Sequence, residues 1–71
     1  MKTLILHFKG WDDWDRPVYE NDGRLYVDVD PRIHRKPEIC TKSDNQFFGE
    51  PDSPVPEDTA ITFEPQRFTW N

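Results

Sequence analysis

The first candidate for chemistry is the segment Trp11-Asp12-Asp13-Trp14-Asp15, in which three carboxylates are interleaved with two indole rings. Clustered carboxylates can bind a hard cation such as Ca²⁺, and Asp28 and Asp30 are acids that could join them. The segment lacks the central glycine and the terminal bidentate glutamate of an EF-hand loop. We therefore interpret it as a loop whose tryptophans close one end of the core and whose aspartates face water, and we predict no metal site.

The softer ligands and nucleophiles are scattered along the chain: they are His7, His34 and Cys40. A zinc site needs three or four convergent ligands, and a cysteine nucleophile needs a base and an orienting acid. His34 precedes Cys40 across Pro37, and this spacing indicates no such geometry. We expect His7 on the polar face of a strand and Cys40 in the core as a small apolar residue.

The glycines give no further support for catalysis. Gly10, Gly23 and Gly49 are too far apart to form a glycine-rich phosphate loop. A chain of 71 residues also has little core with which to enclose a ligand pocket. The sequence therefore predicts a protein that is not an enzyme and that has no cofactor.

Charge is distributed unevenly along a chain whose formal net charge is −5. Residues 1–30 carry a net charge of −3 and residues 43–71 a net charge of −5, whereas residues 31–42 carry +3. The side chains of this basic stretch that could contact an anion are Arg32, His34, Arg35, Lys36 and Lys42. An acidic chain with one short basic stretch is a poor general nucleic-acid binder, because counterion release needs many phosphate contacts. A solvated loop of mixed charge is the simpler interpretation.

Apolar residues alternate with period two, which is typical of strands that turn one face towards a core. Seven prolines leave few windows for a helix. The strand-like stretches are residues 3–8, 17–20, 24–29, 60–64 and 67–70, with Pro65 between the last two. The pattern predicts a mainly β fold, namely a small twisted antiparallel sheet or partly open barrel of about five strands.

A β-hairpin is the clearest local prediction. Asp22-Gly23 is a turn pair that supplies positive φ between two strand-like stretches. A two-residue loop here pairs Tyr19 with Tyr26, so that each face of the hairpin holds residues of like polarity. A three-residue loop with a bulge at the glycine would instead pair Tyr19 with Leu25. We predict the two-residue loop.

One short helical turn and one long loop complete the expected elements. Ser43-Asp44-Asn45-Gln46 matches a capping box, with a serine at the N-cap and a glutamine three residues on. Gly49 would end such a helix after about one turn, so we expect a helical turn over residues 43–48. Three prolines and four acids in residues 50–59 predict an extended, Pro-rich acidic loop.

Residues 1–71 can form only a single small β domain. One cysteine excludes an internal disulfide, so the fold depends on packing or on a partner, and we expect low stability or dimerisation. The residues expected in the core are Leu4, Leu6, Phe8, Val18, Leu25, Val27, Ile61 and Phe63. The apolar run Leu4-Ile5-Leu6 is too short for a signal peptide or a membrane span, so we expect a cytoplasmic protein that makes no membrane contact.

Five aromatic side chains lie at the ends of segments rather than within alternating runs: Trp11, Trp14, Phe47, Phe48 and Trp70. We call this set the aromatic surface. Either these rings close the open ends of the sheet, or at least two of them form an exposed patch for a partner or for self-association. Exposed aromatic clusters commonly mark interaction surfaces, and tryptophan is enriched among the residues that dominate binding energy.

The order of several motifs resembles a known family. Trp11 and Trp14 precede Arg16-Pro17-Val18-Tyr19, Gly23 precedes Leu25-Tyr26, and then follow Ile39-Cys40-Thr41-Lys42-Ser43 and Phe48-Gly49-Glu50-Pro51-Asp52. Over residues 4–63 this series is similar to the large polyvalent protein-associated domain family, type twenty-eight. The resemblance implies a small bacterial protein of Firmicutes and their mobile elements, and it transfers no catalytic residue.

The sequence thus favours a non-enzymatic protein-interaction module that acts beside a larger mobile-element protein. Its partner would be an unidentified protein or a second copy of the chain. The alternative is a nucleic-acid-related role, through direct binding by the basic stretch 32–42 or through acidic mimicry that inhibits a DNA-handling enzyme.

Overall fold

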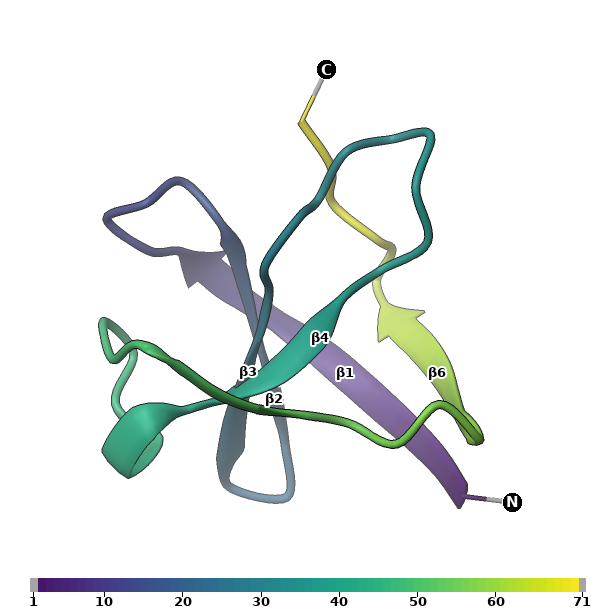
Figure 1. The fold of residues 1–71 in the computed structure, drawn as a ribbon, viewed down its shortest axis with the longest axis horizontal. Helices are drawn as coiled ribbons and strands as arrows, with labels where there is room; N and C mark the ends of the chain where they lie inside the picture. Colours follow the sequence, from purple (N-terminus) through teal and green to yellow (C-terminus); the bar gives the residue numbers. More distant parts are fainter. Residues whose placement is uncertain (1, 71) are drawn as a thin grey trace.

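A computed structural model describes residues 2–70 of the chain. Its elements are β1 (Lys2–Trp11), β2 (Pro17–Asn21), β3 (Arg24–Asp28), β4 (Ile39–Lys42), the 3₁₀ turn η1 (Ser43–Asn45), β5 (Pro51–Pro54) and β6 (Thr59–Glu64). The strands form one sheet in the order β5-β4-β3-β2-β1-β6. The sheet curls, so that β4 lies in front of β1 (Figure 1). The expectation of a mainly β domain with an open sheet is confirmed.

The direction of pairing differs from the expectation at one edge of the sheet. The ladders from β5 to β1 are antiparallel, whereas β6 pairs parallel with β1, with Leu4 beside Ile61 and Leu6 beside Phe63. The chain leaves β5 at one edge and crosses to the opposite edge, where β6 begins beside the start of β1. The sheet is therefore mixed rather than wholly antiparallel. Alternation reveals the faces of a strand but not the direction of its neighbour.

The β2–β3 hairpin has the predicted register. Tyr19 pairs with Tyr26 and Asn21 with Arg24, so only Asp22-Gly23 forms the loop. The two loop residues have positive φ angles of 52° and 83°, as a type I′ turn requires. The two-residue loop is confirmed, and the three-residue alternative is wrong.

β4 and β5 add strands where we expected connections, and β5 lies inside the expected loop 50–59. Proline is confined to edge strands because it has no N–H for the ladder, and β5 begins and ends with proline at the edge of the sheet. The strand expected over residues 67–70 is absent, and only an isolated bridge joins Arg32 to Trp70. Pro65 follows β6 directly and separates this segment from the ladder.

The helical turn lies where we expected it, but the capping box does not form. η1 covers Ser43–Asn45 and no side chain caps it. The Gln46 side-chain amide donates instead to the Asp44 carbonyl oxygen. A Cβ atom at Gly49 would lie 2.5 Å from the Ser43 carbonyl oxygen, so the backbone approach after this turn requires glycine.

In the part of the chain that the structure describes, no helix has the length and apolarity to cross a membrane.

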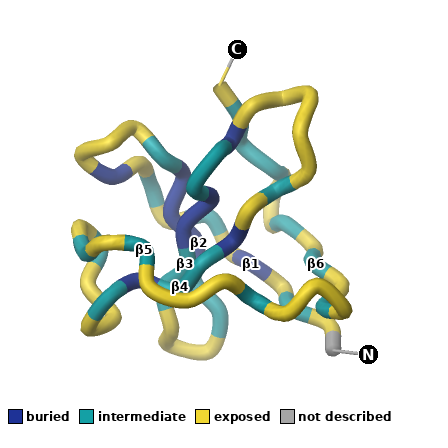
Figure 2. Tube along the Cα trace, in the orientation of Figure 1, coloured by how far each residue is buried: buried dark blue, intermediate teal, exposed yellow. Residues whose placement is uncertain are grey.

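The apolar core is thin and lies along the middle of the sheet (Figure 2). Its buried members are Leu6, Val18, Tyr19, Val27 and Ile39. The expectation is confirmed for Leu6, Val18 and Val27, whereas the other five expected residues are only half-buried: Leu4, Phe8, Leu25, Ile61 and Phe63. Apolar side chains of β1, β3 and the edge strand β6 are therefore partly in contact with solvent.

Candidate functional site

A buried lysine joins two loops at one end of the molecule. Lys42, the last residue of β4, places its Nζ 2.8 Å from Asp12 Oδ2 and 3.1 Å from the Gly49 carbonyl oxygen. Asp12 begins the β1–β2 loop and Gly49 lies in the η1–β5 loop. The side chains of Lys42 and Asp12 are fully buried. Including Lys42 among the anion-contact residues was therefore wrong, because its ammonium is already paired inside the protein.

Asp12 organises the β1–β2 loop from inside. Its Oδ1 accepts the N–H groups of Trp14 and Arg16, both at 2.9 Å, and its Oδ2 accepts Arg16 Nε at 3.1 Å in addition to Lys42 Nζ. Burial opposes ionisation, but the Lys42 ammonium and the Arg16 N–H outweigh it and hold the pKa of Asp12 below its ordinary value. The expectation that the aspartates of this loop face water is wrong for Asp12.

Four of the five rings of the aromatic surface are exposed, and two of them are exposed most. Trp14 and Phe48 are each 66% exposed, and they lie on the two loops that Lys42 joins. The Arg16 guanidinium lies 5.6 Å from the centroid of the Trp14 ring. Phe47 meets Phe48 edge-on, with ring centroids 4.9 Å apart. At least two of the five rings are thus exposed, which is one of the two alternatives that the sequence left open.

Phe47 is half-buried and lies over a bulge in β1. The register of β1 against β2 shifts between Phe8 and Gly10, and Gly10 has a φ of 152°. A Cβ atom at Gly10 would lie 3.3 Å from Phe47 Cζ, so the ring packs directly on the glycine backbone. This contact brings the η1–β5 loop against the end of β1.

The other two rings of the aromatic surface, Trp11 and Trp70, are each 37% exposed but also contact the rest of the protein. Trp11 meets Phe8 and Phe68 edge-on, with ring centroids 5.9 and 6.3 Å apart. Trp70 donates its indole N–H to the Asp15 carbonyl oxygen at 2.6 Å. Phe68, which sequence reasoning did not single out, packs on Phe8 with centroids 4.0 Å apart. Trp11 and the C-terminal segment therefore pack over the end of the core.

The basic stretch forms the β3–β4 loop, where its arginines are paired within the protein. Arg32 and Arg35 both contact Asp30, with N–O distances of 2.8 and 3.2 Å. His34 and Lys36 are exposed, and no acidic partner of either is found within residues 2–70. The loop therefore presents fewer free cations to an anion than its composition indicates.

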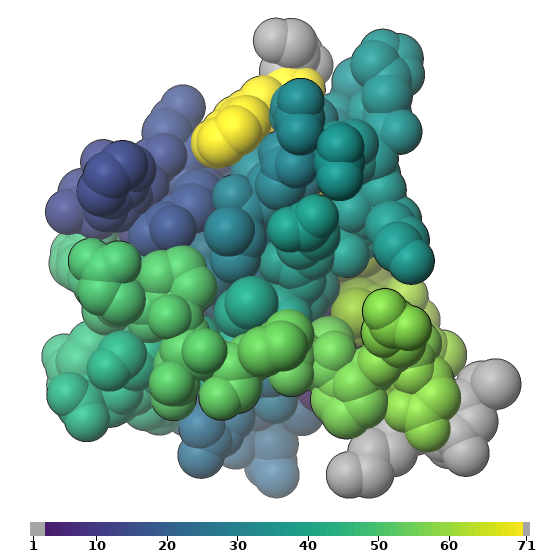
Figure 3. Space-filling view, in the orientation of Figure 1, coloured from purple at the N-terminus to yellow at the C-terminus, as the bar shows by residue number. Residues whose placement is uncertain are grey.

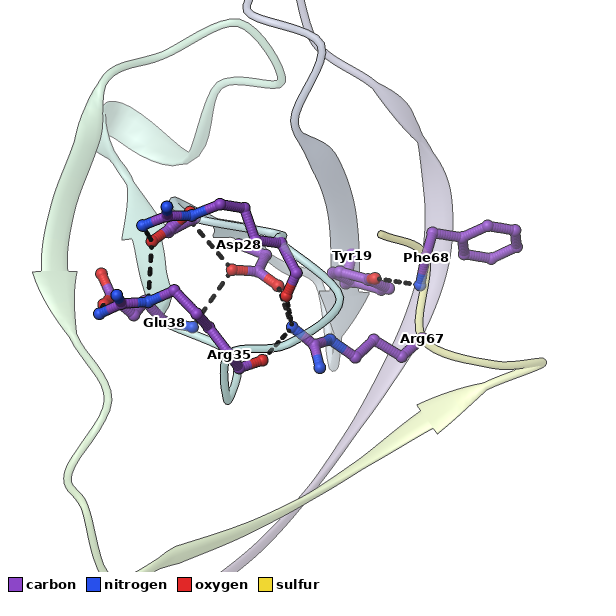
Figure 4. Close-up of polar contacts among 8 residues, drawn as sticks. Tyr19, Asp28, Arg35, Glu38, Arg67 and Phe68 are labelled. Carbon is purple, nitrogen blue, oxygen red and sulfur yellow. Dashed lines mark hydrogen bonds and ion pairs between the residues drawn. The ribbon is translucent and has the colours of Figure 1, made fainter. Parts of the chain in front are cut away.

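A second buried carboxylate, Asp28, lies behind this loop (Figure 4). Its Oδ1 accepts the N–H groups of Asp30 and Glu38, both at 3.2 Å. Its Oδ2 accepts no hydrogen bond, and Arg67 Nη2 is 3.8 Å from it. Burial raises the pKa of Asp28, and the two N–H groups and Arg67 offset this only in part. Asp28 therefore keeps one buried oxygen without a hydrogen bond.

The segment after β6 fixes the β3–β4 loop in place. Arg67 Nη2 donates to the carbonyl oxygens of Arg32 and Arg35 at 3.2 and 2.7 Å. The Phe68 N–H donates to the hydroxyl oxygen of the buried Tyr19 at 3.1 Å (Figure 4). Burial raises the pKa of the Tyr19 hydroxyl, which keeps it protonated.

Sequence reasoning missed the buried charges because charged side chains are expected at the surface. One signal for Lys42 was available, since it lies two residues after Cys40 and shares its face of the strand. For Asp12 the signal was Arg16 at the fourth position after it. Asp28 has no such local mark, because its partner Arg67 comes from the far end of the chain.

The remaining candidate ligands and nucleophiles do not converge. No group of three or more histidine, cysteine or acidic side chains that could hold a metal ion occurs between residues 2 and 70. His7 is exposed, as we expected, and Cys40 is half-buried rather than in the core. Burial raises the pKa of the Cys40 thiol, which disfavours the nucleophilic thiolate.

Comparisons with models of known protein families, with curated proteins and with solved structures return no match to this chain. The family resemblance stated from the motifs stays a prediction. The geometry of the aromatic surface and of the two buried carboxylates is therefore the basis for a functional assignment.

Proposed function

We propose that this chain is a small, non-enzymatic protein-interaction module whose partner binds at the aromatic surface. The observation that carries the proposal is the 66% exposure of both Trp14 and Phe48. Burial of a large aromatic side chain stabilises a fold by about 1.5 to 3 kcal/mol. A domain with so thin a core would be more stable if it buried these rings. A role in binding explains why they are exposed.

The loops that carry these rings are fixed before any partner arrives. Lys42 contacts both loops from inside, and Asp12 holds the loop that precedes β2 in a single conformation. Preorganised aromatic side chains lose little freedom on binding, and such residues often dominate the energy of an interface. The buried ion pair therefore supports binding by positioning the rings of Trp14 and Phe48.

Direct nucleic-acid binding, one form of the nucleic-acid alternative, has weaker support. The arginines of the basic stretch are paired with Asp30, and Lys42 is buried against Asp12. The formal net charge of −5 also opposes contact with a phosphate backbone. Association with a mobile-element protein is part of our proposal, and its support is the order of motifs in the sequence.

Affinity capture from a lysate of the organism that encodes the chain tests this proposal. The baits are the unmodified protein, the double variant Trp14→Ser/Phe48→Ser, and Ile33→Ser as a control on the 57% exposed Ile33 of another loop. We expect a protein that the unmodified chain and the control retain and that the double variant loses. Because the changed side chains are exposed, all baits should melt within a few degrees of one another.

The salt dependence of capture separates the two functions. A hydrophobic protein contact persists when the salt concentration rises from about 50 to 200 mM, whereas a phosphate contact loses affinity steeply. Retention of the same protein by the double variant would contradict the role of the aromatic surface. Loss of capture after nuclease treatment would favour the nucleic-acid alternative.

A further inference from the structure

A groove of about 730 Å³ opens between β4 and β6, on a different side of the molecule from the aromatic surface. Its apolar lining comes from Ile39 of β4, from Val55 just after β5, and from Ile61 and Phe63 of β6. Figure 3 shows the hollow between the teal β3–β4 loop and the green segment that leads into β6. Its volume falls within the range of ordinary ligand sites, about 300 to 1,000 Å³.

β6 borders this groove with a free edge, because it pairs with β1 on one side only. The Asn21 side chain donates to the Ile5 carbonyl oxygen at 2.8 Å, so the backbone polar groups of Ile5 point towards β2. These groups alternate along a strand, so those of Leu4 and Leu6 point towards β6. In a parallel ladder, a residue whose N–H and C=O point towards the adjacent strand bonds to the two residues on either side of its paired residue. The N–H and C=O of the paired residue itself point away from the ladder.

The partners of the two leucines are Ile61 and Phe63, which therefore present their N–H and C=O groups to the free edge. The hairpin gives the same result independently. Its two-residue loop makes Glu20 face β1, where its partner is His7, so the odd-numbered residues of β1 point towards β2. The side chains of Ile61 and Phe63 also line the groove. Main chain and side chains of β6 are thus both available to an extended occupant.

Two residues that line the groove hold buried polar atoms without a hydrogen-bond partner. These atoms are Thr59 Oγ1, at the start of β6, and Arg67 Nε, beyond its end. A third such atom, Asp28 Oδ2, belongs to the ion-pair partner of Arg67. Native proteins leave few such atoms unsatisfied, and each calls for an explanation such as a missing partner.

The charged groups of the groove differ between its two ends. Lys36 and Arg67 lie at the end formed by the β3–β4 loop, whereas Glu57 lies at the end where β6 begins. Glu38 also lines the groove, but its carboxylate lies 3.7 Å from Arg35 and is partly neutralised. An occupant with an acidic group at the first end and a basic group at the second would be complementary.

We propose that the groove binds an extended segment of a partner protein, which adds to β6 as an antiparallel strand. Antiparallel pairing is slightly more stable per residue than parallel pairing, and strand addition to a free edge is a common mode of peptide recognition. The segment places apolar β-branched side chains against Ile61 and Phe63. Its amino-terminal end carries an acidic residue beside Lys36 and Arg67, and its carboxy-terminal end carries a basic residue beside Glu57. This proposal does not rest on the aromatic surface.

The test uses a synthetic heptapeptide of alternating valine and threonine, with a glutamate at its amino-terminal end and a lysine at its carboxy-terminal end. Both termini are blocked, and a second peptide has the two charged residues exchanged. Titration into the isotopically labelled protein is followed by nuclear magnetic resonance and amide hydrogen exchange. We expect saturable binding that slows exchange at the Ile61 and Phe63 amides. Exchange at Thr62 should change little, because its N–H already faces β1.

Three variants distinguish strand addition from other contacts. Ile61→Pro removes the edge-facing N–H and should weaken binding at least tenfold, whereas Ile61→Val keeps the N–H and should weaken binding far less. Lys36→Glu changes an exposed residue and should remove most of the preference for the first peptide, because Arg67 and Glu57 keep their charges. Since Ile61→Pro could fail to fold, the charge inversion at Lys36 tests the proposal independently.

Several results would overturn the proposal. One is a set of resonance changes confined to Trp14 and Phe48, which would place the peptide on the aromatic surface. Another is an unchanged peptide preference in Lys36→Glu. A third is a dimer in light scattering with a protected Ile61 amide in the absence of peptide, which would show that a second copy of the chain occupies the β6 edge.

Discussion

The side chains of Asp12 and Asp28 are both fully buried, yet their hydrogen-bond and ion-pair partners differ. Both oxygens of Asp12 accept hydrogen bonds, and two of these come from the cations of Arg16 and Lys42. Only one oxygen of Asp28 accepts hydrogen bonds, and Arg67 stays 3.8 Å from the other. The pKa of Asp12 is accordingly lowered and that of Asp28 is raised.

The difference separates a region in which the buried charge is fully paired from one in which it is only partly paired. Around Asp12, both carboxylate oxygens are paired, and the two loops joined there carry the exposed rings of Trp14 and Phe48. Around Asp28, pairing is incomplete, and residues that line the adjacent groove hold two further polar atoms without hydrogen bonds. A buried carboxylate stabilises a structure only when both of its oxygens have partners. An oxygen without a hydrogen bond loses its contact with water and gains nothing in return.

Asp12→Ala should have the largest effect, since it leaves the Lys42 ammonium buried without its carboxylate. Breaking such a pair costs about 3 to 5 kcal/mol, a large share of the stability of a small domain. Urea unfolding measures the loss, with the exposed Asp13→Ala as a control that should change stability by less than about 0.5 kcal/mol. The double variant Asp12→Leu/Lys42→Met should recover part of the stability, because it removes the unpaired ammonium but not the loss of the hydrogen bonds from Trp14 and Arg16. A double variant as unstable as Asp12→Ala would contradict the role of the unpaired charge.

Truncation of the core should be costly near its centre and mild at the groove. Leu6 is fully buried, so Leu6→Ala should cost about 2 to 5 kcal/mol. Phe63 is half-buried on the groove wall, so Phe63→Ala should cost less than about 2 kcal/mol. Thermal melting of both variants checks the order. Equal losses would show that the groove wall belongs to the core.

Two glycine substitutions compare the packed η1–β5 loop, whose Gly49 carbonyl contacts Lys42, with the open hairpin turn at Gly23. Gly49→Ala would place a Cβ 2.5 Å from the Ser43 carbonyl oxygen and disturb the loop whose carbonyl accepts Lys42 Nζ. We expect a loss of about 1 to 3 kcal/mol. Gly23→Ala meets no atom but keeps a positive φ, so it should cost about 1 kcal/mol. Chemical denaturation of the pair should rank Gly49→Ala as the less stable, and the reverse order would argue against close packing of this loop.

Asp28→Asn should have the smallest effect at neutral pH. The amide keeps an oxygen for the N–H groups of Asp30 and Glu38 and removes the cost of burying a charge. We expect a stability that is unchanged or higher by up to about 1 kcal/mol. A loss of several kcal/mol at pH 7 would show that Arg67 compensates the Asp28 charge fully.

The pH dependence of stability gives the two carboxylates opposite signs. The raised pKa of Asp28 means that its contribution is present below the ordinary carboxyl pKa, about 3.9, and is lost as the pH rises through the raised value. The lowered pKa of Asp12 means that its contribution is present above that ordinary pKa and is lost as the pH falls. Unfolding measured from pH 3 to 8 should therefore show the advantage of Asp28→Asn growing with pH. An advantage that shrinks with pH would contradict this assignment.

Contacts between residues close together in the sequence could be predicted from it, whereas contacts between distant segments could not. Asp22-Gly23 fixed the hairpin register, because turn chemistry and alternation act over a few residues. The direction of β6 against β1 and the meeting of Asp28 with Arg67 depend on segments far apart in the chain. For the aromatic surface, the sequence identified the five rings but left open whether they close the core or are exposed, and the pairing of Lys42 with Asp12 was not predicted.

The composition of β5 has a consequence for assembly. Pro51 and Pro54 make up half of this four-residue edge strand and offer no N–H to a further strand, and Asp52 between them adds a charge. Growth of a fibril by sheet extension requires two receptive edges on each molecule, one that joins the growing end and one that accepts the next molecule. This sheet has a receptive edge only at β6, so strand addition stops after one event. Any aggregate built by edge pairing would therefore be limited to a closed pair.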